Sequence, residues 1–165
     1  MKILIDDFKK YKKYKKYIDV ILLYFSSRAF QAVVLYRISN YLYKNGMKKL
    51  SIIIKNKSIK LTGCEIGEST EIGKGFKIAH SVGIVISGNS KIGENVIIQG
   101  SVIIGTNREE IHEYPKIGNN VYIGAGAKIL GNINIGNNVI IGANSVVIKD
   151  VEDNSTVVGV PAKLI

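Results

Sequence analysis

The chain has 165 residues, enough for one domain of ordinary size with its own core. Its 46% hydrophobic content and two prolines exclude a disordered tail, and the single cysteine, Cys64, excludes an internal disulfide and suits a reducing compartment. We expect a cytoplasmic protein, because Asp6 and Asp7 stand where a signal peptide needs an apolar stretch. The apolar run from Ile18 to Phe25 is far shorter than the ~20 residues that span a bilayer.

The net charge of +10 lies largely before residue 60. Between residues 9 and 17, six lysines are interleaved with Tyr11, Tyr14 and Tyr17, which is typical of a lysine-coated helix that packs its tyrosines on a partner. The alternative is a peripheral contact with a membrane surface or a polyanion through basic and amphipathic side chains. We expect no nucleic-acid partner, because no known nucleic-acid-binding motif accompanies the charge.

Residues 1–58 form the expected N-terminal helical region. Glycine is rare there, and apolar side chains recur at helical intervals from Phe30 to Leu42, before a C-terminal cap at Asn45-Gly46. This pattern predicts two or three helices.

From Leu61 onward, glycine becomes frequent and an apolar β-branched residue returns every sixth position. Three series carry it: Ile66, Ile72, Ile78 and Ile84; Ile92, Ile98 and Ile104; Ile117, Ile123, Ile129, Ile135, Ile141 and Val147. A fixed short period signals a solenoid, because no single repeat can bury its own apolar face. A repeat of six residues predicts a triangular coil of short strands and turns, with successive coils stacked at about 4.8 Å. The predicted fold class is mainly β: a parallel β-helix over 59–150, preceded by the small helical region and followed by a C-terminal tail over 151–165.

Two interruptions break the repeat. The series slips by two residues between Ile84 and Ile92, and the polar segment from Thr106 to Pro115 fits no hexad. We expect a loop at 106–116 that leaves the prism. Loops on a rigid scaffold are favoured positions for binding and catalysis.

Several segments from residue 60 onward carry a resemblance to a known family. They are Ile78-Ala-His-Ser-Val-Gly-Ile-Val-Ile86, Pro115-Lys-Ile-Gly118, Ile123-Gly-Ala-Gly-Ala-Lys-Ile-Leu-Gly-Asn132 and Val158-Gly-Val-Pro-Ala-Lys163. The chain resembles the hexapeptide-repeat acyltransferases, specifically the serine acetyltransferase branch with its relatives that acetylate polysaccharides of the colanic-acid type. The resemblance implies a left-handed winding and a homotrimer, with a dimer of trimers left open. It also implies acetyl-CoA as co-substrate in the groove between two prisms, with no metal.

His80 and Glu65 are the expected catalytic residues. An imidazole titrates near neutral pH, so its free nitrogen can take a proton from an attacking hydroxyl, and the family places its base at this position. Glu65 lies fifteen positions back, which we expect to put it about one coil below His80 and slightly to the side, able to fix the ring's tautomer. The alternatives are a structural histidine and an exposed carboxylate. Backbone amides near Gly83 or Gly105 are candidate oxyanion donors.

The resemblance also carries acetyl-CoA contacts onto this sequence. Small side chains would let the pantetheine arm lie flat, and two late lysines could meet phosphate groups; the expected positions are Gly105, Thr106, Ala125, Gly126, Ala143, Lys149 and Lys163. The alternative is that small residues only turn corners and that the lysines meet water.

The sequence departs from the serine acetyltransferase pattern at the acceptor. That branch carries an Asp before the histidine and an Arg-His pair before Pro-Lys-Ile, whereas this chain has Ala79 and Glu113-Tyr114. Replacing a carboxylate-binding Arg by Glu reverses the charge. We therefore expect a sugar or polysaccharide hydroxyl as acceptor, with Tyr114, Glu113 and His112 as contacts, although His112 fits a plain loop histidine better.

Other functions stay open as alternatives. The first is serine O-acetylation in cysteine biosynthesis, and the second is a non-enzymatic scaffold at a membrane surface or a structural solenoid, although an ice-binding solenoid would need uninterrupted coils. A zinc enzyme of the gamma carbonic anhydrase kind needs three histidines, and the chain has only His80 and His112.

Overall fold

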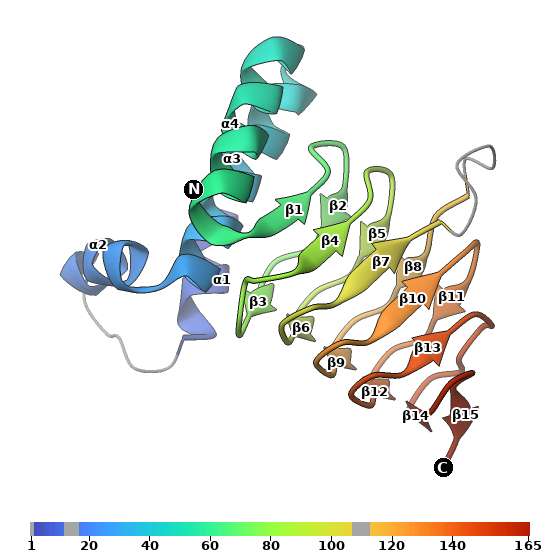
Figure 1. The fold of residues 1–165 in the computed structure, drawn as a ribbon. Helices are drawn as coiled ribbons and strands as arrows, with labels where there is room; N and C mark the ends of the chain where they lie inside the picture. The colour runs from blue at the N-terminus through green and yellow to red at the C-terminus, as the bar shows by residue number, and fades with distance from the viewer. Residues whose placement is uncertain (1, 12–16, 107–112) are drawn as a thin grey trace.

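The computed structural model describes residues 2–11, 17–106 and 113–165, in which four helices precede a stack of short strands (Figure 1). The helices are α1 (Lys2–Lys9), α2 (Tyr17–Ser26), α3 (Arg28–Lys44) and α4 (Lys48–Thr62). The helical region therefore runs four residues past the expected boundary at 58, and it ends where Gly63 takes the left-handed conformation at φ 66°.

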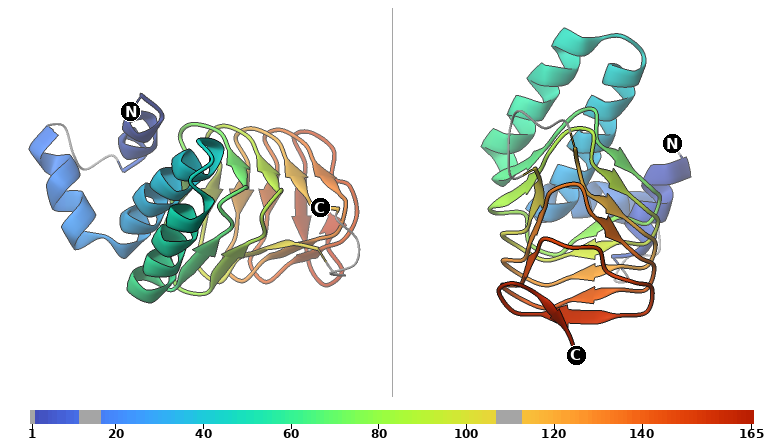
Figure 2. Two further views of the ribbon diagram at one scale, coloured as in Figure 1. Left: turned by 90° about the horizontal axis from the view of Figure 1, so that it is seen from above. Right: turned by 90° about the vertical axis from the view of Figure 1, so that its right-hand side faces the viewer.

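The remaining chain winds into a parallel β-helix, which confirms the predicted fold class. Successive strands enter three sheets in turn, so that each sheet forms one face of a triangular prism (Figure 2). Sheet A holds β1 (Cys64–Ile66), β4 (Ile84–Ile86), β7 (Ile103–Gly105), β10 (Lys128–Leu130) and β13 (Val146–Val147). Sheet B holds β2 (Glu71–Ile72), β5 (Lys91–Ile92), β8 (Lys116–Ile117) and β11 (Asn134–Ile135). Sheet C holds β3 (Lys77–Ile78), β6 (Ile97–Ile98), β9 (Tyr122–Ile123), β12 (Ile140–Ile141), β14 (Thr156–Val158) and β15 (Lys163–Leu164).

The hexad isoleucines fill the interior of the prism. Ile78, Ile98, Ile123 and Ile141 stack along sheet C and are fully buried, while the residue before each of them faces outward or is half-buried. This alternation follows from the strand period of two. Because each isoleucine contacts those above and below it, the coils form one continuous apolar core.

Asparagines turn the corner between sheets B and C. Asn120, Asn138 and Asn154 have positive φ near 60°, a conformation that asparagine tolerates better than other residues with a side chain. Their amides form a ladder in which Asn120 donates to Asn138 at 3.1 Å and Asn138 donates to Asn154 at 2.9 Å. The corner is thus stabilised by side chains of successive coils as well as by the backbone.

The register slip lies elsewhere than the sequence suggested. Cys64 pairs with Ile84, twenty residues further on, whereas Val85 pairs with Ile103 after eighteen. The two extra residues therefore sit in the corner 79–83, before Ile84 and not after it. The predicted position of the slip was wrong because both ends of β4 point inward. Ile84 therefore follows Ile78 at an interval of six residues, although it occupies a different position in its hexad.

Helices α1 and α3 cover the first coil through buried polar contacts. The carboxylate of Asp7 is fully buried, accepts from the Phe76 N–H at 2.8 Å and pairs with Arg37 at 2.8 Å. Arg37 also donates to the carbonyls of Ile72 and Gly73, each at 2.6 Å. These contacts satisfy backbone groups that no preceding coil can reach.

Tyr11 reaches the prism from a turn, because α1 already ends at Lys9. Its ring lies 5.2 Å from that of Phe30, and its hydroxyl donates to the Ile78 carbonyl at 3.0 Å. The expected packing of tyrosines on a partner therefore holds for Tyr11 within the chain itself. The expected helical repeat at 12–16 lies outside the described residues.

The segment predicted as a C-terminal tail contains two strands. β14 stacks on β12, and β15 turns back to pair with β14 in antiparallel fashion, Val157 opposite Leu164. The sequence gives no sign of this pairing, because Lys163 and Leu164 do not continue the hexad series.

Candidate active site

His80 occupies the corner that carries the two extra residues. It follows β3, its side chain is exposed, and the next residue, Ser81, turns inward and is buried. The corner then bulges at Val82, which is 65% exposed, and closes at Gly83, whose φ of 75° favours glycine. The insertion therefore presents the imidazole at the outer edge where sheets C and A meet.

Small residues continue this corner below His80. A Cβ atom added at Gly100 would lie 3.2 Å from the Cβ of His80, so the histidine is stacked directly on that glycine. The next coils place Ala125 and Ala143 on the same corner, both exposed, joined by a backbone hydrogen bond from Asn144 to Ala125 at 2.8 Å. Gly126, half-buried at φ 74°, donates to the Gly100 carbonyl at 2.9 Å. The structure thus brings His80 together with three of the predicted cofactor positions.

Glu65 lies in the same coil as His80, not one coil below it. Because the first coil is twenty residues long, Glu65 stands at its start on β1 and His80 near its end. The Glu65 side chain is exposed on the outer face of sheet A, and among the described residues no hydrogen bond joins it to the imidazole. Its proposed part in catalysis stays a prediction.

The backbone amide of Gly83 is not available as an oxyanion donor. The Gly83 N–H donates to the Gly63 carbonyl at 3.0 Å and is therefore occupied. Its role is structural, because it ties the bulged corner to the end of α4.

The second group of predicted residues lies at the opposite edge of sheet A. Gly105 is buried at the end of β7 beside the Ser87 hydroxyl, and Thr106 follows it. Further along the chain, Glu113 is exposed and Tyr114 is half-buried, next to the buried Pro115. His112 lies outside the described residues. The width of one three-residue strand, roughly 10 Å, separates this edge from the His80 corner.

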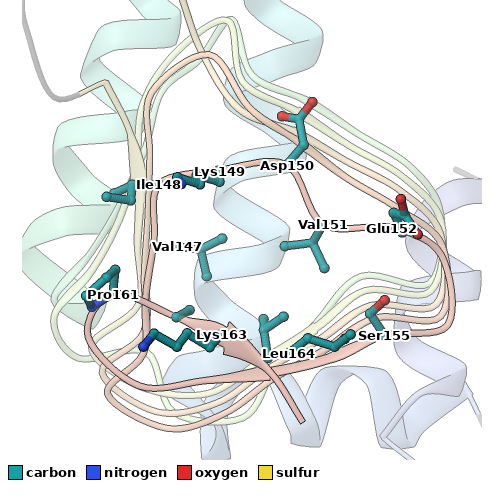
Figure 3. A pocket seen from close by; sticks show the side chains of 12 residues that line it. Val147, Ile148, Lys149, Asp150, Val151, Glu152, Ser155, Pro161, Lys163 and Leu164 are labelled. Atoms are coloured by element: carbon teal, nitrogen blue, oxygen red, sulfur yellow. The ribbon is translucent and has the colours of Figure 1, made fainter.

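Lys149 and Lys163 both lie at the far end of the prism. Both line a pocket of about 500 Å³ at the open end of the last coil, where Val147 and Val151 point inward and Leu164 closes one side (Figure 3). Lys149 follows β13, which is the fifth strand of sheet A, and His80 belongs to the first coil. Lys149 therefore lies roughly 19 Å further along the axis, at four strand spacings of about 4.8 Å.

Gly100 is a site residue that sequence reasoning missed. The expected period of eighteen aligns His80 with Ile98, and only the two extra residues in the first coil bring Gly100 beneath it. The Gln99-Gly100-Ser101 segment, where glycine breaks the usual Ile-Gly spacing, was the available signal.

Metal ligands do not gather around His80. Over residues 2–11, 17–106 and 113–165, no three His, Cys, Asp or Glu side chains lie close enough to hold a metal ion.

A β-helix with six-residue winding, interrupted to present one histidine above a small-residue corner, defines a class of protein, the hexapeptide-repeat transferases. The family model described as "Bacterial transferase hexapeptide (six repeats)" matches residues 114–149.

Solved and curated relatives narrow the class. The soybean serine acetyltransferase complexed with serine superposes with a TM-score of 0.90 at 32% identity, over 99% of this chain and 68% of that one. The serine acetyltransferase from Brucella abortus strain S19, in complex with coenzyme A, superposes with a TM-score of 0.90 at 34% identity, over 99% of this chain and 66% of that one. The serine acetyltransferase of Synechococcus elongatus is 38% identical over 82% of this chain. The chain therefore belongs to the serine acetyltransferase family. It spans only about half the length of the curated relatives it matches, 56% in that last case.

Proposed function

We propose that this chain is an acetyl-CoA-dependent O-acetyltransferase in which His80 is the general base. The observation that carries the proposal is the exposed imidazole in the bulged corner, directly above Gly100, Ala125 and Ala143. A thin, extended thioester can lie along this line of small residues, because Gly100, Ala125 and Ala143 project nothing larger than a methyl group. The relative from Brucella abortus, whose structure contains coenzyme A, supports this choice of co-substrate.

The proposed reaction is a direct transfer. A ring nitrogen of His80 accepts the proton of the acceptor hydroxyl as its oxygen attacks the thioester carbonyl. The tetrahedral intermediate then collapses, the carbon–sulfur bond breaks, and the imidazolium returns its proton to the departing thiolate. Because both proton transfers use one group, the mechanism needs an imidazole that is reachable from outside the prism.

Lys149 and Lys163 are proposed to meet the phosphate groups of the co-substrate. Both line the pocket at the last coil, and Lys149 lies roughly 19 Å along the axis from the coil of His80, a separation that an extended pantetheine arm can bridge. Gly105 and Thr106 belong to the opposite edge of sheet A. Within one chain they lie apart from His80, so they serve the same co-substrate only if a neighbouring prism brings that edge against the His80 corner.

A homotrimer is therefore part of the proposal. Assembly supplies a second wall for the groove and a partner for the exposed Glu65. Sedimentation of the full chain tests this: a trimer is expected, and a catalytically active monomer contradicts it. We propose the cytoplasm as the location of the enzyme.

Serine is the proposed acceptor, since the matched relatives are serine acetyltransferases and one of the solved structures contains serine. A sugar hydroxyl is the second candidate. It is favoured by Ala79 and by Glu113-Tyr114, which stand where the resemblance implies an Asp and an Arg-His pair. Glu113 is exposed. In the proposed site its negative charge repels a carboxylate and leaves a neutral polyol unaffected.

The test is thiol release from acetyl-CoA by the purified chain, offered L-serine and a panel of sugars in parallel, with the product identified by mass spectrometry. We expect turnover that His80→Ala reduces by about 10²–10⁴-fold. The control is Glu94→Ala, which changes an exposed side chain at the corner between sheets B and C.

The outcomes separate the candidates. O-acetylserine as product supports the first acceptor, and an acetylated sugar supports the second. Undiminished turnover in His80→Ala removes the proposed base. Failure of the folded protein to bind coenzyme A or release thiol with any acceptor favours a scaffold.

A further inference from the structure

Helix α2 exposes an apolar stripe that the β-helix does not use. Ile18, Ile21, Leu22 and Phe25, which we call the α2 stripe, follow the i, i+3, i+4, i+7 spacing of one helix face. Their side chains are 57%, 55%, 57% and 77% exposed. The opposite side of α2 is also apolar, since Leu23 is 3% exposed. Among residues 2–11, 17–106 and 113–165, nothing covers the side of α2 that carries this stripe.

The turn at Ser27 points α2 away from the rest of the chain. Ser27 is extended at φ −123° and ψ 107°, and its hydroxyl accepts from the Phe30 N–H at 3.2 Å, so it ends α2 and caps α3. The two helices meet at a bend of 107°. Figure 2 shows α2 beyond α3, on the side away from the prism.

The charge of the chain is concentrated in the same region. Residues 1–63 contain fifteen Lys and Arg against three Asp and Glu, a net charge of +12, whereas residues 64–165 contain eight against ten, a net charge of −2. Along the sequence, Lys9 and Lys10 precede α2 and Arg28 follows it. The surface that lacks an apolar partner is thus the strongly basic end of the molecule.

The exposed apolar stripe and the positive charge of this region together indicate which kind of partner fits it. A second copy pairing through α2 would bring two +12 regions together, and a nucleic acid offers nothing to cover the apolar side chains. An anionic bilayer surface provides both an apolar layer and negative charge. We propose that the α2 stripe inserts into the interface of an anionic membrane and holds the chain there peripherally. Among the described residues, no single helix is long and apolar enough to cross a bilayer, and only α2 and α3 taken together, across their bend, pass on length and composition.

Vesicle flotation tests the proposal with the full chain and no acetyl-CoA, so that its outcome is independent of catalysis. We expect binding to vesicles of phosphatidylcholine with phosphatidylglycerol and little binding to phosphatidylcholine alone. Raising salt from about 0.05 M to about 0.5 M should weaken binding, because the charge contribution is screened. Phe25→Glu should lower the partition coefficient roughly tenfold or more, since it replaces an inserted aromatic ring by a charge.

The matched control is Ile165→Glu, which adds the same charge to an equally exposed residue, 77% in both cases, at the other end of the chain. It should bind as the unmodified protein does. Leu22→Gln tests the stripe again without adding charge, and circular dichroism checks that each variant folds.

Three results overturn the proposal. One is no binding to anionic vesicles, and another is equal loss in Phe25→Glu and Ile165→Glu. The third is unchanged vesicle binding by both stripe variants. If Phe25→Glu in that case alters only the sedimentation of the protein, the stripe joins copies of this chain. If heparin or RNA displaces the protein equally from vesicles in all variants, charge alone is responsible for binding.

Discussion

The position of His80 depends on residues that lie outside the proposed active site. The N–H and C=O of Ile78, two residues earlier, lie on the free edge of sheet C, where no further strand can pair with them. The Tyr11 hydroxyl donates to that carbonyl at 3.0 Å and accepts from that N–H at 3.3 Å. A side chain from the N-terminal region thus completes the strand that delivers the histidine to its corner.

Tyr11→Phe should destabilise the chain by about 1–3 kcal/mol, because two backbone groups lose their partner in a largely buried place. The measurement is denaturant unfolding followed by circular dichroism. Tyr41→Phe is the matched control, since Tyr41 is 65% exposed, and it should change stability by less than about 0.5 kcal/mol. Equal stability of the two variants means that the Tyr11 contact contributes nothing.

At the scale of elements, the corner between sheets C and A is the feature that the proposed chemistry needs. Four successive coils give it His80, Gly100, Ala125 and Ala143, so that one imidazole stands at the head of a smooth edge. The corner between sheets B and C carries asparagines instead, and it is closed by their mutual hydrogen bonds. The two corners are built from the same repeat, but the corner between sheets C and A also carries the two extra residues of the first coil.

Ala125→Leu should raise the KM for acetyl-CoA about tenfold or more and change kcat less, because the added side chain obstructs binding along the corner without reaching the base. Ala125 is exposed, so the core and the melting temperature should be unaffected. Steady-state kinetics with varied acetyl-CoA check this. Lys116→Leu, an exposed change on sheet B, is the control, and an unchanged KM in Ala125→Leu places the co-substrate elsewhere.

The repeat itself made the β-helix predictable. Each hexad isoleucine has to point inward, so the period of six states the fold directly, and α3 follows equally from its apolar spacing. The position of the slip was not predictable, because Ile84 is buried in either register. Nor were Asp7 with Arg37, or Gly100 beneath His80, since these pairs join residues twenty or more positions apart without any shared periodicity.

The stability of the folded chain depends on pH in the alkaline range. Burial raises the pKa of Cys64 to about 12, with the charge of Glu65 adding to the effect, and burial also raises the pKa of Tyr11 and Tyr36 above the usual value. These groups stay neutral in the folded chain while they ionise in the unfolded one. Stability is therefore complete below about pH 8.5, where unfolded cysteine titrates, and falls as pH rises toward 12.

Between pH 8 and pH 10, the free energy of unfolding should fall by about 2 kcal/mol through Cys64 alone, at about 1.4 kcal/mol per pH unit. Urea unfolding at a series of pH values measures the slope. Cys64→Ala should flatten it by one proton's contribution, and an identical slope in that variant means that the thiol ionises freely in the folded state.

The two ends of the prism differ in whether they can be extended. At the first coil, side chains of α1 and α3 already occupy the backbone groups of residues 70–76, so a new coil inserted there would displace Asp7 and Arg37 from their partners. At the last coil, Val147 and Val151 face an open pocket, and only the short β15 folds across it. Adding a hexad triplet is therefore expected to break fewer contacts at the last coil than at the first.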